Sequence, residues 1–380
     1  MPSRAEQLLS LGQSVWLDYI RRGELNDGTF DRLVSDSGIV GVTSNPTIFQ
    51  NAIAGSDDYD ESLQQHARNG LAGPELFEAL AVEDIQSACD HLRPVFQRTG
   101  GRDGRVSIEV NPRLAANTAG TIDEGLRLHR SVGRPNVMVK VPATAAGLPA
   151  ITELTAEGVC INVTLIFSLA RYEQVMDAFL TGLEELARRA QPLESIVSVA
   201  SFFVSRVDSK VDKAIEQRLA TLPSGATERA ELEAALGQAA IANARLAYHR
   251  FREVFASARF AALDAKGARV QRPLWASTST KNPAYRDVLY VEELIGADTV
   301  NTMPPQTLTA FNDHGVVESR IENDLDEARS LFKRLPALGV PVESLIDQLE
   351  AEGVAAFAKS YESLLETLES RRLQMAGGRG

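Results

Sequence analysis

The sequence is poor in several features that point to particular classes of protein. Cysteine occurs only twice in 380 residues, at Cys89 and Cys160, and this separation is not a metal-ligand spacing. So few cysteines are typical of a protein in a reducing compartment. We therefore expect a cytoplasmic protein in which both cysteines act as small, buried apolar residues.

Long apolar runs are also absent. No segment reaches the roughly 18 apolar residues needed to span a bilayer, and the N-terminus lacks the basic start and apolar core of a signal peptide. The chain holds 39 basic and 51 acidic residues, a net charge of −12. This balance argues against general binding to nucleic acids or anionic membranes, so any anionic ligand must be held by local basic residues.

Motifs for common cofactors and metals are missing as well. The glycines form neither GxGxxG nor GxxxxGK[ST], which leaves no sequence case for a dinucleotide or P-loop site. The five histidines show no spacing typical of metal ligands. We therefore expect no metal site and no dinucleotide or P-loop nucleotide site.

What the sequence does contain is an alternation of short apolar strands and amphipathic helical stretches. Turn residues bound eight candidate strands, at 14–18, 38–46, 104–112, 136–144, 159–167, 195–204, 272–278 and 298–303. Eight strands alternating with helices predict an α/β protein whose parallel sheet closes into a (β/α)8 TIM barrel. Extra helices are expected at about 50–104, 207–271 and 317–372. No linker divides the chain, so we expect a single domain over 1–380.

Several strands alternate between an apolar face and a face that carries functional groups. The polar side chains of the second face are Asp18, Ser107, Glu109, Asn111, Lys140, Asn162 and Thr164. In the strand at 159–167 the opposite face is apolar through Ile161, Val163 and Leu165. A barrel accounts for this pattern because the apolar face packs under helices. The other face points inward, and its residues near the carboxyl ends of the strands surround the usual catalytic position.

Lys140 is the most unusual of these residues, because it lies between two valines in an apolar strand. A lysine is almost never buried without a reason. Burial disfavours the ammonium form and supplies a neutral amine, which can attack a carbonyl group to form an imine. The segment alone leaves open an ordinary ion pair with Glu109. The predicted convergence of an amine with two carboxylates favours catalysis, because two carboxylates can divide the acid and base steps.

Five motifs together resemble the transaldolase family. They are GVTSNPTIF (41–49), VSIEVNPRLA (106–115), VMVKVPAT (137–144), INVTLIFS (161–168) and WASTSTKNP (275–283). The motifs occur in the order that the family has, and the resemblance spans all eight predicted strands, roughly residues 12 to 312. The chain length and the last motif are similar to the long bacterial subgroup of the family.

The resemblance implies an enzyme of the non-oxidative pentose phosphate pathway. Such an enzyme transfers a dihydroxyacetone unit from sedoheptulose 7-phosphate or fructose 6-phosphate to an aldose phosphate, either glyceraldehyde 3-phosphate or erythrose 4-phosphate. A lysine Schiff base carries the unit, so no cofactor is needed. The expected partners are these small sugar phosphates, with no nucleic acid and no membrane, and the expected assembly is a monomer or homodimer.

Position by position, the resemblance makes Lys140 the Schiff-base lysine and Asp18 the acid/base for C–C cleavage. Glu109 would work through a water molecule that Thr164 helps to position. The residues expected to bind substrate are Asn45 and Asn162 at the hydroxyls of the dihydroxyacetone unit, Ser201 in the same pocket, and Arg206, Ser279 and Lys281 at the phosphate.

One departure from the family concerns the phosphate site. Many relatives carry arginine where this chain has Lys281, which replaces a bidentate fork with a point charge. Two of the expected ligands also have ordinary structural alternatives, since Asn45 could form a turn after a strand and Arg206 could pair with Asp208.

Two other functions stay open: a fructose-6-phosphate aldolase-like enzyme that releases free dihydroxyacetone, and a catalytically silent barrel that acts as a scaffold.

Overall fold

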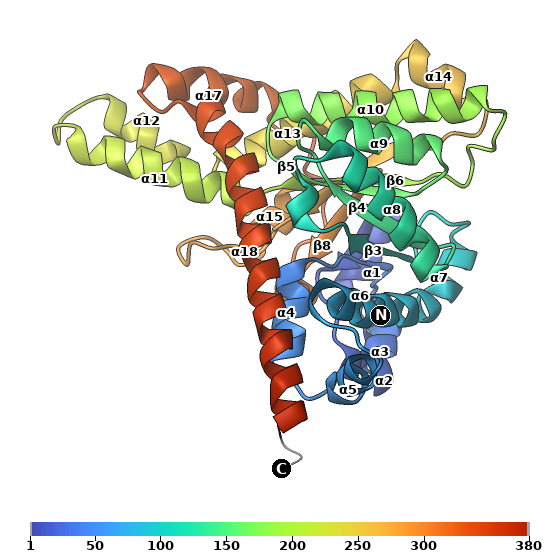
Figure 1. Cartoon of the computed structure of the whole chain (residues 1–380). Coiled ribbons are helices and arrows are strands. Elements are labelled where there is room, and N and C mark those ends of the chain that lie inside the picture. Colours follow the sequence, from blue (N-terminus) through green and yellow to red (C-terminus); the bar gives the residue numbers. More distant parts are fainter. Residues whose placement is uncertain (1, 378–380) are drawn as a thin grey trace.

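The computed structural model describes residues 2–377 and contains a closed barrel of eight parallel strands (Figure 1). The strands follow one another around the barrel in chain order, and β8 pairs with β1 to close it. Each strand overlaps a predicted segment, so the (β/α)8 prediction is confirmed. Their bounds are β1 Gln13–Leu17, β2 Gly41–Val42, β3 Arg105–Glu109, β4 Val137–Pro142, β5 Ile161–Ile166, β6 Ser198–Phe203, β7 Gln271–Ala276 and β8 Thr299–Met303.

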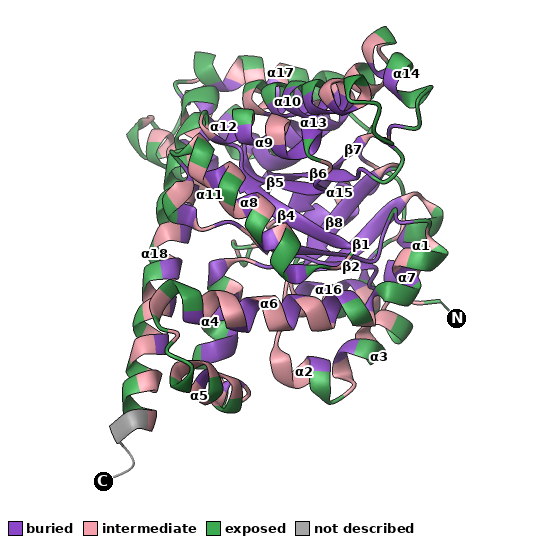
Figure 2. Cartoon of the chain, turned by 45° about the vertical axis from the view of Figure 1, so that its right-hand side comes forward, coloured by how far each residue is buried: buried purple, intermediate pink, exposed green. Residues whose placement is uncertain are grey.

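Helices surround the barrel, and the buried strands lie inside this layer (Figure 2). Within residues 2–377, no helix has both the length and the apolar character needed to cross a membrane. The helices outside the three predicted insertions are α1 Arg4–Ser10, α2 Arg22–Asn26, α3 Thr29–Asp36, the 3-10 helix η1 Pro112–Leu114, α8 Thr118–Val132, α9 Gly147–Ala156, α10 Leu169–Arg188, α15 Leu289–Glu293 and α16 Pro305–His314.

The three predicted insertions are also helical, which confirms the extra helices. The long α18 is the red helix that runs down one side of the molecule in Figure 1, and it packs against α4, α6 and α11. The inserted helices are α4 Pro46–Ala54, α5 Asp60–Arg68, α6 Gly73–His91, α7 Arg93–Arg98, α11 Ser205–Thr221, α12 Glu228–Ala235, α13 Ala239–Phe255, α14 Ala258–Asp264, α17 Leu325–Ala337 and α18 Val342–Gly377.

The second strand is shorter than its predicted segment, and the residues after Val42 make side-chain hydrogen bonds at this end of the barrel. Thr43 donates a hydrogen bond to Asp18, and Ser44 donates one to the backbone of β3. Asn45 accepts a bond from the first turn of α4 and so caps that helix. The strand therefore ends where the functional end of the barrel begins.

The chain departs from regular strand geometry at two positions of the predicted alternation. Asn111 lies beyond the strand, because β3 ends at Glu109, and the Asn111 amide donates to the hydroxyl of Tyr361 on α18. Leu165 adopts a left-handed φ of 60° where the β5–β6 register is irregular. Its side chain meets α18 at Gly353. Both departures occur where the barrel contacts the C-terminal helix.

The opposite end of the barrel contains a buried ion pair that belongs to the fold. Arg272 of β7 lies 2.9 Å from Asp103, and their side chains are 4% and 5% exposed. Asp103 also accepts hydrogen bonds from Ser14 and Trp16 of β1. Because active sites of such barrels lie at the carboxyl ends of the strands, this hydrogen-bonded cluster at the amino ends belongs to the scaffold of the barrel.

Candidate active site

Three functional side chains lie side by side on neighbouring strands at the carboxyl end of the barrel. The register pairs Lys140 of β4 with Glu109 of β3 and with Asn162 of β5. The Lys140 Nζ atom is 3.2 Å from Glu109 Oε2, and these side chains are only 5% and 6% exposed. Nζ also donates a hydrogen bond of 3.1 Å to the carbonyl oxygen of Ser44. The predicted burial of Lys140 is confirmed, and the ion pair left open by the sequence is present.

The position of Glu109 changes its acidity. Burial raises the pKa of Glu109 to about 7, although the charge of Lys140 acts in the opposite direction. The negative charge of Asp18 raises the pKa of Glu109 further, and the charge of Lys140 acts on both carboxylates. A carboxylate with a pKa near neutrality is a stronger proton acceptor than an ordinary glutamate, which suits Glu109 to take a proton from Lys140.

Asp18 follows directly after β1 and is held by threonines. Thr43 Oγ1 donates to Asp18 Oδ1 over 2.7 Å and lies 2.7 Å from the hydroxyl of Thr302 in β8. Burial raises the pKa of Asp18, while the charge of Lys140, the bond from Thr43 and the charge of Lys281 lower it. The inward position predicted for Asp18 thus gives it a fixed orientation beside the lysine.

Asn162 is the best-anchored of the predicted substrate ligands. Its amide nitrogen donates to Ser107 Oγ at 3.0 Å, and its amide oxygen accepts from Ser201 Oγ at 2.7 Å. All three residues are buried. Thr164, two residues further along β5, is also fully buried, and its hydroxyl has no hydrogen-bond partner in the part of the chain that the structure describes. Buried hydroxyls usually find a partner, so Thr164 is available to a water molecule or a substrate.

Asn45 lies at the same end of the barrel but has a structural task. Its amide oxygen accepts from the Ile48 backbone N–H at 3.0 Å and caps α4. This is the turn that the sequence left open as an alternative. It commits the oxygen of Asn45, so the amide nitrogen is the group that could bind a substrate hydroxyl.

Arg206 lies in the first turn of α11, just beyond the end of β6. Its guanidinium lies over the ring of Phe203, 5.5 Å from the centroid, and burial lowers its pKa. Arg206 has no ion-pair partner among the described side chains, and Asp208 instead accepts from the hydroxyl of Tyr290 and the backbone N–H of Ala240. The alternative pairing of Arg206 with Asp208 is therefore wrong.

Ser279 and Lys281 lie in the loop after β7, the strand next to β6. Lys281 Nζ donates to Ser279 Oγ over 2.7 Å, and its side chain is exposed. Its charge nevertheless reaches Asp18, whose pKa it lowers. No hydrogen bond joins Arg206 to Ser279 or Lys281 in the described part of the molecule, and the three predicted phosphate ligands follow the neighbouring strands β6 and β7.

Two tyrosines hold the β7 loop and the segment after it against α11, and sequence reasoning missed them. Tyr285 donates to Asp212 and Tyr290 donates to Asp208, both over 2.8 Å. These bonds tie the segment that follows Lys281 to the helix that carries Arg206. Thr43 and Ser44 were also missed as individual side chains, although the TSNP run that contains them was a visible signal.

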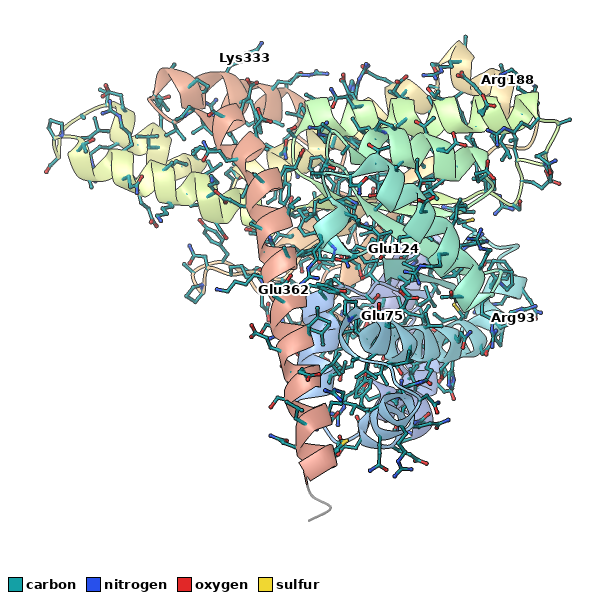
Figure 3. All side chains as sticks on the ribbon, viewed as in Figure 1. Glu75, Arg93, Glu124, Arg188, Lys333 and Glu362 are labelled. Carbon is teal, nitrogen blue, oxygen red and sulfur yellow. The ribbon has the colours of Figure 1, made fainter. Side chains whose placement is uncertain are left out.

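A cavity of about 720 Å³ lies beside the barrel, between β3, α4, α6, α8 and α18. Its wall includes Glu109, so the cavity reaches the site from the side. The lining also includes carboxylates of Glu75, Glu78 and Glu124, of which Figure 3 labels the first and last, and Arg127 pairs with Glu78. Carboxylates repel an anion, so this side of the site is unsuited to a phosphate.

Comparison with known proteins agrees with this geometry. The family model described as Transaldolase/Fructose-6-phosphate aldolase matches residues 15–368. The chain belongs to this family. A transaldolase of Saccharopolyspora erythraea is 48% identical, with 97% of this chain and 98% of that protein covered. A transaldolase of Thermobifida fusca is 50% identical over 96% of this chain and 97% of the relative. One from Trichodesmium erythraeum is 42% identical over 96% of both chains.

Because the chain belongs to the transaldolase/fructose-6-phosphate aldolase family, the pKa of Glu109 should be visible in the pH dependence of catalysis. Below pH about 7, Glu109 holds its own proton and cannot accept one from Lys140. We expect kcat/KM for a ketose phosphate to rise as the pH increases through about 7. Glu109→Gln should abolish this rise and lower kcat/KM about a hundred- to ten-thousand-fold, as measured by steady-state kinetics across the pH range.

Asp208 supplies the matched control, because burial and the neighbouring Asp212 raise its pKa to about 7 as well. Asp208 has no hydrogen bond or ion pair with Lys140 among residues 2–377, so Asp208→Asn should retain the rise in kcat/KM. If the rise persists in Glu109→Gln and disappears in Asp208→Asn, Glu109 is not the titrating group at the site.

Proposed function

We propose that this chain is a transaldolase. It transfers a dihydroxyacetone unit from sedoheptulose 7-phosphate or fructose 6-phosphate to glyceraldehyde 3-phosphate or erythrose 4-phosphate, in the non-oxidative pentose phosphate pathway. The observation that carries the proposal is the buried Lys140 amine, 3.2 Å from a glutamate of near-neutral pKa. Full-length similarity to proteins named transaldolase supports the same reaction.

In the first step the neutral Lys140 nitrogen attacks the C2 carbonyl of the ketose phosphate. Glu109, which has accepted the ammonium proton, returns a proton through a water molecule to the C2 hydroxyl, and this oxygen leaves as water. The product is an iminium ion at Nζ. Thr164 supports this step because its buried hydroxyl can hold the water molecule near Glu109.

Asp18 acts in the second step. It removes the proton of the C4 hydroxyl, and the C3–C4 bond breaks. The electron pair of that bond enters an enamine conjugated with the lysine nitrogen. The aldose phosphate then departs. The hydrogen bond from Thr43 keeps the Asp18 carboxylate oriented. Asn162, which Ser107 and Ser201 hold in place, and Asn45 are the proposed ligands for the hydroxyls of the three-carbon unit.

The third step reverses the second with a different aldehyde. The enamine carbon attacks the carbonyl carbon of the acceptor, and the new hydroxyl takes its proton from Asp18. Hydrolysis of the iminium then releases the ketose and restores the Lys140 amine. A covalent intermediate that outlasts the first product predicts ping-pong kinetics.

Phosphate binding is assigned to the basic side of the site. Arg206 and Lys281 supply positive charge beyond the ends of β6 and β7, and Ser279 adds a hydroxyl. The absence of an ion-pair partner for Arg206 among residues 2–377 supports this assignment, since a partly buried guanidinium is costly unless an anion binds it. Local charge can therefore hold a dianion on a chain whose net charge is −12.

A fructose-6-phosphate aldolase-like reaction would use the same lysine but end with protonation of the enamine. The sequence similarity favours transfer, because the relatives compared above are named transaldolases.

We also propose a cytoplasmic location, which the two buried and unpaired cysteines support. The assembly, a monomer or homodimer, stays a prediction.

A coupled assay with fructose 6-phosphate and erythrose 4-phosphate tests the proposed reaction. We expect production of sedoheptulose 7-phosphate and glyceraldehyde 3-phosphate, with parallel lines in double-reciprocal plots because the kinetics are ping-pong. Free dihydroxyacetone should be a minor product. If free dihydroxyacetone forms at the rate at which fructose 6-phosphate disappears, the chain is an aldolase instead.

Removal of the Lys281 ammonium tests the phosphate assignment. A hydrogen bond to a charged group contributes about 1.5–3 kcal/mol, so Lys281→Ala should raise KM for fructose 6-phosphate about ten- to a hundred-fold. Turnover of a non-phosphorylated ketose should barely change. Lys333→Ala is the control, because Lys333 lies on α17 at the periphery of the molecule (Figure 3). Equal effects of Lys281→Ala on both substrates would reject Lys281 as a phosphate ligand.

A further inference from the structure

The C-terminal helix α18 lies across the catalytic end of the barrel. Side-chain contacts attach it to four segments that directly follow strands β2, β3, β5 and β6, namely α4, η1, α10 and α11. Because these segments all begin at the carboxyl ends of their strands, α18 covers the side of the barrel on which Lys140 lies. The contacts are Thr47 with Ser360, Arg113 with Glu362, Arg171 with Glu350, and Lys210 with Glu352.

A glycine in the middle of α18 allows the helix to approach the barrel closely. A Cβ atom at Gly353 would lie 3.0 Å from Leu165 Cδ2 and 3.4 Å from the ring of Phe167, both from the end of β5 or just beyond it. Glycine weakens the interior of a helix relative to alanine. A larger residue at this position would crowd Leu165 and Phe167, so Gly353 allows α18 to pack close to the barrel over the site.

Phe357 follows Gly353 by one helical turn and therefore lies on the same face of α18. Its ring centroid is 5.5 Å from Lys140 Nζ, and the residue is only 5% exposed. The face of an aromatic ring attracts a cation within about 6 Å, most strongly when water is excluded. Phe357 thus joins Glu109 and the Ser44 carbonyl as a neighbour of the reactive nitrogen.

We propose that Phe357 is a further catalytic residue, which stabilises the cationic iminium on Lys140 and keeps water from the enamine formed after C–C cleavage. This inference rests on the proposed transaldolase reaction. If Phe357 acts in this way, the C-terminal helix influences the ratio of transfer to release of the three-carbon unit.

The chemistry defines two separate effects of the ring. When the amine condenses with the ketone and water leaves, the positive charge forms on Nζ, and the ring quadrupole stabilises that charge. After cleavage, the enamine carbon has two possible electrophiles. Attack on an aldehyde carbon gives the new ketose, whereas uptake of a proton from water gives an iminium that hydrolyses to free dihydroxyacetone. A ring packed over Nζ hinders the second path.

Two changes at position 357 separate these effects. Phe357→Leu removes the ring and opens space, so the ratio of free dihydroxyacetone to transferred product should rise about ten-fold or more. Pentafluorophenylalanine at position 357 retains the ring shape but reverses its quadrupole. This variant should keep the wild-type product ratio and form the iminium about three- to thirty-fold more slowly, as measured by single-turnover borohydride trapping with fructose 6-phosphate.

Leu368→Ala is the matched control, because Leu368 is fully buried on the same helix but lies three turns beyond Phe357. It should lower the thermal midpoint without changing the product ratio or the trapping rate. A wild-type product ratio in Phe357→Leu, or a wild-type trapping rate in the pentafluoro variant, overturns the inference. If the wild-type protein itself shows no transfer and no trapping, the proposed function fails instead, so the two failures are distinct.

Discussion

The buried ion pair between Lys140 and Glu109 is the interaction on which the site depends. Two charges removed from water are costly unless they are close and otherwise hydrogen-bonded. Closure of the barrel places β3 and β4 side by side and in register, which brings the two groups within 3.2 Å. The carbonyl of Ser44 adds a further bond to the ammonium. The remaining cost of burial appears as the raised pKa of Glu109, and this prepares the pair to exchange a proton.

Charge is distributed unevenly around this pair. On the side of β3, the cavity next to Glu109 is lined by several glutamates. Beyond β6 and β7, Arg206 and Lys281 provide positive charge, and tyrosine–aspartate hydrogen bonds hold the segment after Lys281 against α11. A sugar phosphate is therefore expected to direct its phosphate toward β6 and β7 and its ketone toward Lys140.

The positions of Lys140, Glu109 and Asn162 could be predicted because a strand has a period of two and a barrel has only one interior. The rule did not predict the left-handed φ of 60° at Leu165, because nothing in the local sequence pattern indicates this irregularity in the strand. The contact of Phe357 with Lys140 was also beyond prediction. The amphipathic pattern of its segment indicates a helix, but the surface that this helix covers depends on the packing of the whole fold.

Borohydride reduction in the presence of fructose 6-phosphate, followed by peptide mapping, tests the central claim most directly. A Schiff base at the buried amine predicts one reduced three-carbon adduct, located on the peptide that contains Lys140 and absent when the sugar is omitted. An adduct on any other lysine, or no adduct in a protein that still catalyses transfer, would contradict the account.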